Sequence, residues 1–157
     1  MTPIICAEEL TKMLKKELTY FTPSSDKVST NGITYKTGFM PIPKNNTEKE
    51  KNFPYIAVRP FHIEDYGPEA DDESTANLYI LVGTYNEDKD NGHYELYNMM
   101  EMIRQAILKH PVIGGNFELK YPLKGDIPES QGFPTWFGYL EARYSIPNTT
   151  EEVNIDE

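Results

Sequence analysis

The pattern of apolar positions is strongest between residues 77 and 110. Residues 78–85 read LYILVGTY, with bulky apolar side chains at both even and odd positions. Because neighbouring side chains of a strand point to opposite faces, this run predicts a central strand covered on both faces. After a short acidic loop, residues 94–109 repeat apolar side chains at steps of three and four, which predicts an amphipathic helix. This stretch therefore predicts the middle of a sheet and the helix that covers it.

Apolar spacing predicts further elements before and after this stretch. A helix is expected near residues 7–21, with Glu8 and Glu9 in its first turn and Pro23 as its stop. Period-two alternation predicts strands, and Pro60 indicates an edge position or a bulge in the second of them. The predicted strands, besides the central one, are 32–40, 53–63, 117–123 and 135–146.

The order of these elements, α-β-β-β-α-β-β, bounds the fold class. Strands grouped in hairpins, with helices that do not alternate with them, indicate an α+β domain. We predict a mostly antiparallel sheet of about five strands packed with two helices. The predicted core is Leu10, Leu14, Leu18, Ile56, Val58, Leu78, Ile80, Val82, Leu96, Ile103, Ile107, Leu119, Leu140 and Tyr144.

Length and cysteine content add bounds on organisation. A chain of 157 residues fits a single domain, which we place at residues 1–147, followed by a flexible acidic tail at residues 148–157. The single cysteine, Cys6, cannot form an internal disulfide and suits a reducing cytoplasm. No run of about 18 apolar residues is present, so no membrane span is expected.

The formal charge of −10 comes from two places. One is an acidic loop without Lys or Arg, and the other is the C-terminal tail. The simplest interpretation is a solvated loop and a solvated terminus; the functional one is a surface that repels DNA or wrong partners. The absence of a basic patch argues against sequence-specific DNA binding. The candidate loop residues are Glu64, Asp65, Glu69, Asp71, Asp72 and Glu73.

Candidate catalytic and metal-binding residues are sparse. The histidines, His62, His93 and His110, have no helical metal spacing, and Cys6 is far from them in sequence. A cation near a helix C-terminus would explain His110. We therefore predict neither enzymatic activity nor a cofactor.

The loop at residues 86–92 resembles a calcium loop only in part. Oxygen side chains stand at the first, third and fifth positions. The turn glycine comes one place late, and Tyr97 stands where the bidentate glutamate belongs. The loop is therefore predicted to be an ordinary turn in which Asn91 or Gly92 caps the following helix.

Several segments together resemble a family of phage proteins. They are FPYIAVRP at residues 53–60, the acidic loop and apolar strand that follow, YNED at 85–88, VIGGNFELKYPL at 112–123 and PTWFG at 134–138. The chain resembles the tail terminator, also called tail completion or minor tail protein, of long-tailed bacteriophages. The likeness covers about residues 53–147 and is weaker for the first helix. Its motifs are structural, so no functional residues can be carried over one by one.

The resemblance implies a subunit that assembles as a six-membered ring. Such a ring caps the head-proximal end of the tail tube, stops its polymerisation and offers a surface to the head connector protein, while DNA passes through its lumen. The implied partners are copies of itself, the tail tube protein and the connector. The implied location is the virion, after synthesis in the host bacterial cytoplasm. The abundance of tyrosine, eleven residues, suits such interfaces.

An acidic loop facing the lumen, or lying in an assembly interface, would let DNA slide without sticking. This placement is a hypothesis about the six loop residues, Glu64, Asp65, Glu69, Asp71, Asp72 and Glu73.

Three alternatives remain open. The first is another head–tail connector or neck protein of the same virion. The second is a small cytosolic regulatory or ligand-binding domain, which would be a monomer or dimer with a closed apolar pocket. The third is an enzyme, which would need a polar cleft around His62 or His93.

Overall fold

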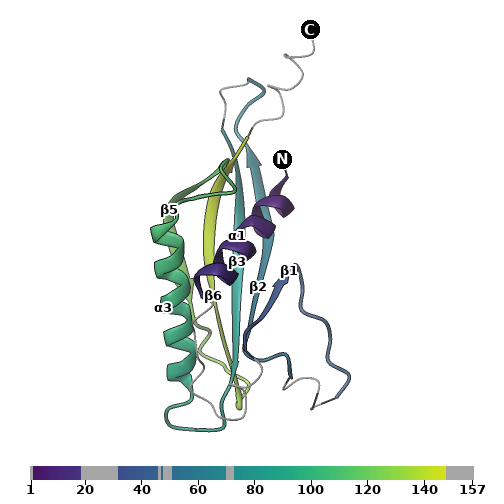
Figure 1. Ribbon diagram of the computed structural model, residues 1–157, viewed down its shortest axis with the longest axis vertical. Helices are drawn as coiled ribbons and strands as arrows, with labels where there is room; N and C mark the ends of the chain where they lie inside the picture. The colour runs from purple at the N-terminus through teal and green to yellow at the C-terminus, as the bar shows by residue number, and fades with distance from the viewer. Residues whose placement is uncertain (1, 19–31, 46, 48–50, 70–72, 148–157) are drawn as a thin grey trace.

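A computed structural model describes residues 2–18, 32–45, 47, 51–69 and 73–147 (Figure 1). Two long helices and six strands are defined in this part of the chain. The helices are α1 (Pro3–Glu17) and α3 (His93–Lys109). The strands are β1 (Thr34–Thr37), β2 (Tyr55–Asp65), β3 (Ser74–Tyr85), β4 (Val112–Ile113), β5 (Phe117–Asp126) and β6 (Thr135–Ile146).

The strands form a single sheet in the order β1-β2-β3-β6-β5-β4. Every neighbouring pair is antiparallel except β1 and β2, which run parallel. The predicted α+β class with a mostly antiparallel sheet is confirmed. The sixth strand, β4, was missed because it has only two residues, between Pro111 and the positive-φ turn at Gly114 and Gly115.

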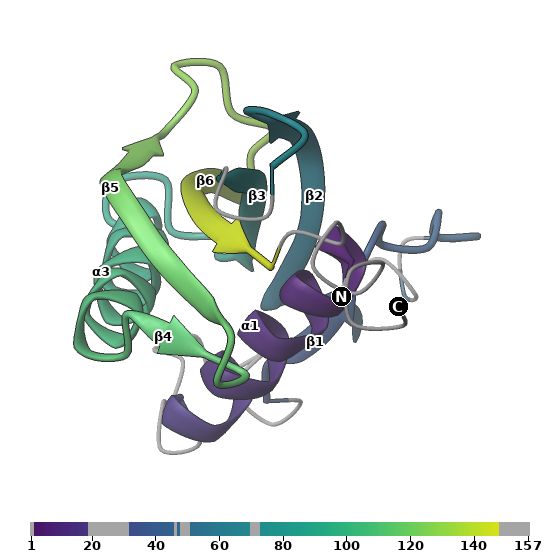
Figure 2. The ribbon, with the colours of Figure 1, turned by 90° about the horizontal axis from the view of Figure 1, so that it is seen from above.

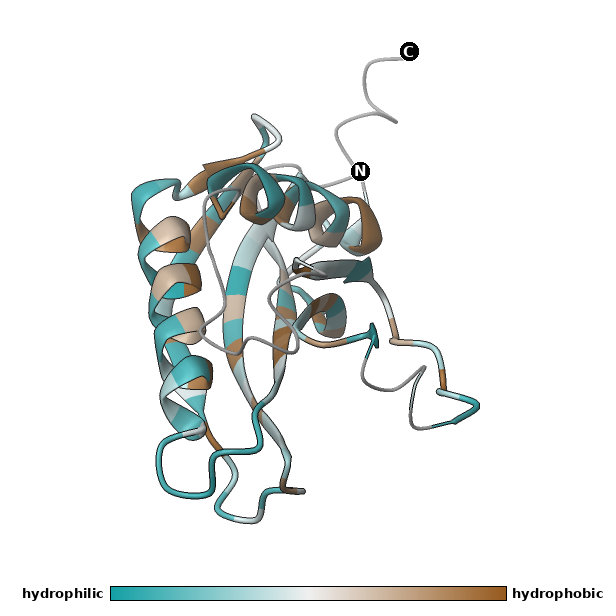
Figure 3. Cartoon of the chain, turned by 60° about the horizontal axis from the view of Figure 1, so that its bottom comes forward, coloured by the Kyte–Doolittle hydropathy of each residue, from teal (hydrophilic) through white to brown (hydrophobic). Residues whose placement is uncertain are grey.

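Both helices pack on the same face of the sheet, as Figures 1 and 3 show. α1 lies mainly over β1 and β2, and α3 lies over β3 and β6. Their buried stripes share one apolar cluster with alternate residues of the strands. Every residue of the predicted core belongs to this cluster, so the predicted core is confirmed.

The start of α1 differs from the prediction. Thr2 is the N-cap, and its hydroxyl accepts a hydrogen bond from the Ile5 amide at 3.3 Å. Pro3 occupies the first turn, where the proline ring fits and no amide is needed. The expectation that Glu8 and Glu9 lie in the first turn was therefore wrong. The spacing of apolar residues does not show where the N-cap lies, and the helix begins four residues earlier than predicted.

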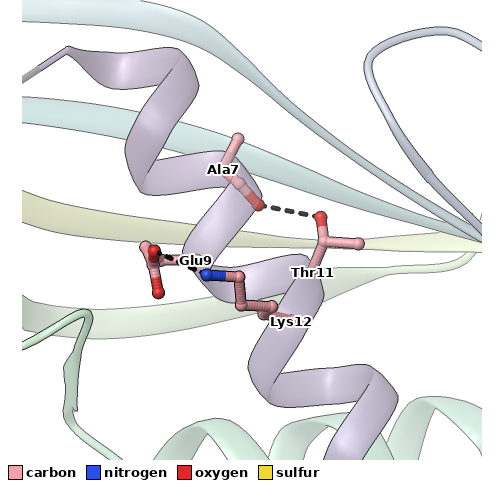
Figure 4. Close-up of polar contacts among 4 residues, drawn as sticks. All are labelled: Ala7, Glu9, Thr11 and Lys12. Carbon is pink, nitrogen blue, oxygen red and sulfur yellow. Dashed lines mark hydrogen bonds and ion pairs between the residues drawn. The ribbon is translucent and has the colours of Figure 1, made fainter.

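Within α1, polar side chains are bonded along the helix. Figure 4 shows the Thr11 hydroxyl donating to the Ala7 carbonyl oxygen at 2.8 Å and the Lys12 ammonium beside Glu9 at 3.2 Å. The predicted stop at Pro23 lies outside the described residues.

β2 and β3 form the long antiparallel hairpin expected from their spacing. The register shifts between Pro60 and His62, which confirms a bulge at Pro60. β3 lies between β2 and β6, so the prediction of a central strand is also confirmed. The described helices pack on one face of β3 only, although none of its residues is exposed, so that both faces are covered stays a prediction.

The aspartate variant of Ile103 tests the helix face. Ile103 is fully buried in the shared core, so Ile103→Asp should lower the free energy of unfolding by about 3 kcal/mol or more by burying an unpaired charge. Denaturant unfolding measures the change. The exposed Asn98→Asp on the same helix is the control, and equal stability of the two variants would contradict the assigned face.

Candidate assembly surfaces

The sheet face opposite the helices, here called the uncovered face, carries a row of aromatic rings. Phe61 of β2 stacks on Tyr79 of β3, with ring centroids 3.7 Å apart and an interplanar angle of 8°. Tyr139 of β6 meets Tyr79 edge-on at 5.4 Å. Phe61 remains 40% exposed, and the two tyrosines are half-buried. Three neighbouring strands thus present one continuous aromatic surface.

A second aromatic group lies toward the other end of the same strands. Phe53, Tyr55 and Tyr85 form a small cluster separate from the main core. Tyr55 is paired across the ladder with Gly83, and a methyl group added at Gly83 would lie 2.2 Å from the Tyr55 ring. The tyrosine ring therefore occupies the space that a side chain on β3 would need.

Polar side chains of both signs surround the aromatic row. The Arg59 guanidinium lies 4.1 Å above the Phe39 ring. Asn77 donates to Glu141 at 3.2 Å, and Arg143 donates to the Tyr121 carbonyl oxygen at 3.4 Å. Aromatic residues inside a polar border are typical of protein interfaces, in which the rings are desolvated and the border stays wet.

The tight fit of Tyr55 on Gly83 gives a stability prediction. Gly83→Ala should destabilise the fold by about 1–3 kcal/mol, because the ring or the strand must move. Thermal or urea unfolding measures this. If the contact is responsible, Gly83→Ala should cost much less in a Tyr55→Ala background; an equal cost in both backgrounds would contradict it.

The acidic loop forms the end of the β2–β3 hairpin. Glu64 and Asp65 are the last residues of β2, Glu69 lies in the turn, and Glu73 precedes β3. Asp71 and Asp72 lie outside the described residues.

Glu64, Asp65 and Glu73 of this loop contact other side chains of the same subunit. His62 lies 2.7 Å from Glu64, and the hydrogen bonds from His62 and Tyr66 hold the pKa of Glu64 below its usual range. The Ser74 hydroxyl donates to Asp65 at 2.7 Å, and Lys120 lies 3.4 Å from Glu73. The hairpin is therefore partly neutralised on its own subunit. Its position in a lumen or an interface stays a prediction.

The turn at residues 86–92 is held by hydrogen bonds to its own side chains. The Asp88 carboxylate accepts from the amides of Asp90 and Asn91, at 3.0 and 3.1 Å. Gly92 is the N-cap of α3, as expected for one of the two candidates. In the described residues no group of three or more His, Cys, Asp or Glu side chains could hold a metal ion.

Asn86 ties this turn to two elements. Its carbonyl oxygen accepts from the Trp136 indole of β6 at 3.1 Å, and its side-chain amide donates to Glu95 of α3 at 3.2 Å. Glu95 is only 2% exposed, and its other carboxylate oxygen has no hydrogen-bond partner in the described structure. Burial raises the pKa of Glu95, although the bond from Asn86 acts in the opposite direction.

Glu95→Gln tests this buried carboxyl. With the pKa of Glu95 raised on folding, its contribution to stability is fully present below the unfolded pKa and is lost as pH rises through the folded pKa. The Tm of Glu95→Gln relative to the wild type should therefore increase between about pH 4 and pH 7. Thermal unfolding across this range, with the exposed Glu118→Gln as control, measures it; a constant difference would contradict the burial effect.

The other histidines have local partners. His110 lies 3.1 Å from Glu17, and the His93 ring stacks on Tyr94 at 4.5 Å. No described helix is long and apolar enough to span a membrane. The uncovered face was not predicted from the sequence; its signal was the apolar side chains at the odd positions of β3, Tyr79 and Leu81.

Comparisons with known proteins supply no assignment. No family model matches the chain, and no curated protein matches it. One chain from a solved structure of the virion of a native gene transfer agent (GTA) particle is similar over 90% of this chain and 97% of that chain. The identity is 12% and the TM-score is 0.48, and a likeness of that size carries no argument about function.

Proposed function

We propose that this chain is a structural subunit of a phage-like virion and acts as a tail terminator. The observation that carries the proposal is the uncovered face, on which Phe61, Tyr79 and Tyr139 form an exposed aromatic row. The resemblance of the sequence to tail terminators supports the specific role. Copies of the chain would form a six-membered ring on the head-proximal end of the tail tube, stop its growth and join it to the head connector.

The uncovered face supports assembly because β3 is apolar on both faces while the described helices cover one. Contiguous apolar surface of this kind marks interaction sites more often than free surface. Large aromatic side chains are the residues that contribute most to binding when they are desolvated. A partner subunit or the tube would supply the missing cover.

The strand edges are poor candidates for edge-to-edge pairing with another chain. Beyond the four residues of β2 paired with β1 and the two residues of β5 paired with β4, the outer edges of these strands carry Pro60 and Pro122. Prolines and bulges on sheet edges discourage pairing with another chain. Faces and loops are therefore the better candidates for assembly.

The acidic hairpin would face the lumen of the ring in this proposal. A surface without phosphate-neutralising cations allows DNA to pass without being held. Glu64, Asp65, Glu69 and Glu73 are its described carboxylates, and Asp71 and Asp72 lie outside the described residues. An assembled structure with this hairpin on the outer rim would exclude the placement.

A different neck protein of the same virion would use the same face, so the uncovered face does not separate the two. A ligand-binding domain would need a closed apolar pocket. The cavity of about 500 Å³ between α3 and β5 is bordered by Glu101, Arg104, Lys124 and Asp126, which is not that arrangement.

The test is substitution of the most exposed ring of the aromatic row. Phe61→Lys should weaken binding to the ends of purified tail tubes roughly tenfold or more, because it places a charge in the desolvated interface. In a host carrying the gene deletion, it should also fail to restore normal tail length. Tail lengths are measured by electron microscopy and ring mass by native mass spectrometry.

The matched control is Tyr94→Lys, since Tyr94 is an exposed aromatic residue on α3, away from the uncovered face. Both variants should retain a wild-type melting profile within a few degrees. Normal tail lengths in the gene deletion, or no binding of the wild type to tube ends, would remove the terminator function. Binding to the head connector alone would favour the other neck protein.

A further inference from the structure

An apolar segment leaves the sheet directly after β1. The Gly38 amide makes a bond to the Val58 carbonyl oxygen at 2.8 Å, and Gly38 has a φ of +109° that turns the chain away from β2. Phe39 is then 72% exposed and Ile42 is 90% exposed. The strand predicted at residues 32–40 therefore ends earlier than expected, at Thr37. Residues 38–43 are called the arm below.

The composition of the arm suits docking better than solvation. Its sequence, GFMPIP, contains no charged residue, and Pro41, Ile42 and Pro43 are all exposed. Each proline restricts φ, so the segment loses less conformational entropy when it binds in an extended form. Such Pro-containing segments dock on grooves lined by aromatic residues. The arm therefore has the chemistry of a ligand for an apolar groove.

A groove of matching chemistry lies between α3 and the C-terminal half of β5. Tyr97 and Met100 of α3 face Leu123 and Ile127, around a volume of about 500 Å³. Tyr97 is 45% exposed and Ile127 is 39% exposed. The groove thus has an apolar part, in which the Tyr97 ring and Ile127 are open to solvent.

The rim of the groove has no excess charge. Glu101 and Arg104 pair with each other at 2.7 Å, and Lys124 and Asp126 stand on the opposite wall. Two acidic and two basic side chains leave a formal charge of zero. An uncharged segment fits such a rim better than the acidic hairpin or the acidic C-terminal residues do.

The arm and the groove lie on opposite sides of one subunit. β1 is at one end of the strand order, while β5 lies next to the other end. In Figures 1, 2 and 3 the segment after β1 projects from the side away from α3. The arm of a subunit is therefore placed for the groove of a neighbour and not for its own groove.

We propose that the arm of one copy of this chain docks in the α3–β5 groove of a second copy. The contact joins two different surfaces, so it is heterologous, and repetition of it generates a closed ring or an open filament. The inference deepens the proposed function and rests on it only in requiring that copies of the chain associate. The arm contact would be a second contact between copies, separate from the one proposed for the uncovered face.

The first experiment uses a fluorescent peptide of residues 37–45 and the full chain, with fluorescence anisotropy as the measurement. We expect saturable binding that Tyr97→Glu weakens roughly tenfold or more and Tyr94→Glu leaves within about twofold. Tyr94 is the matched control because it is an exposed tyrosine on the same helix outside the groove. Absence of saturable binding, or equal binding by the two variants, would overturn the proposal.

The second experiment links copies through engineered cysteines in the full chain. The double variant Ile42→Cys with Tyr97→Cys should give a ladder of disulfide-linked oligomers on oxidation, whereas Ile42→Cys with Tyr94→Cys should not. The native Cys6 adds little background, because it is fully buried and burial raises its pKa to about 12. An identical ladder from both double variants, or none from either, would overturn the arm contact.

Failure of this proposal is distinguishable from failure of the proposed function. Loss of the ladder and of peptide binding, with normal capping of tail tubes by the wild type, removes the arm contact alone. A specific ladder with no effect of the gene deletion on tail length removes the terminator function and leaves the arm contact in place.

Discussion

The fold depends on the antiparallel ladders that hold β3 between β2 and β6. β3 pairs with β6 from Ser74 to Tyr85 without interruption, and with β2 along most of the same length. This continuous pairing fixes which side chains share a face. The even positions of β3 enter the core beneath α1 and α3, and the odd positions form the uncovered face. The register of β3 with β2 and β6 therefore determines both which side chains enter the core and which ones line the uncovered face.

The two faces satisfy different physical demands. On the helix side, aliphatic side chains pack in a dry cluster that also takes in Cys6 and Tyr144. On the uncovered side, aromatic rings cover the strands themselves, as Tyr55 covers the backbone at Gly83. Rings with polar tips can remain half exposed at modest cost and still bury large areas when a partner arrives. Under the proposed function, the same chain would fold alone and then join an assembly.

The functional surfaces differed in how visible they were in the sequence. The apolar residues at the odd positions of β3, Tyr79 and Leu81, indicated that the strand has a second apolar face. They did not indicate that the described helices leave this face uncovered. Phe39 fitted the alternation of β1, yet Gly38 turns the chain away before it. The six-charge hairpin was apparent as a charge cluster, whereas its partners His62, Ser74 and Lys120 depended on the tertiary contacts.

The sequence by itself determined the element types, the central position of β3 and the core, because periodicity is a local property of the chain. It also indicated an edge position or a bulge at Pro60, since proline has no amide to donate. The tertiary structure decided which face of β3 stays uncovered and where the arm and the groove lie. Those features depend on how α1 and α3, far apart in sequence, share one side of the sheet, and no local pattern encodes that choice.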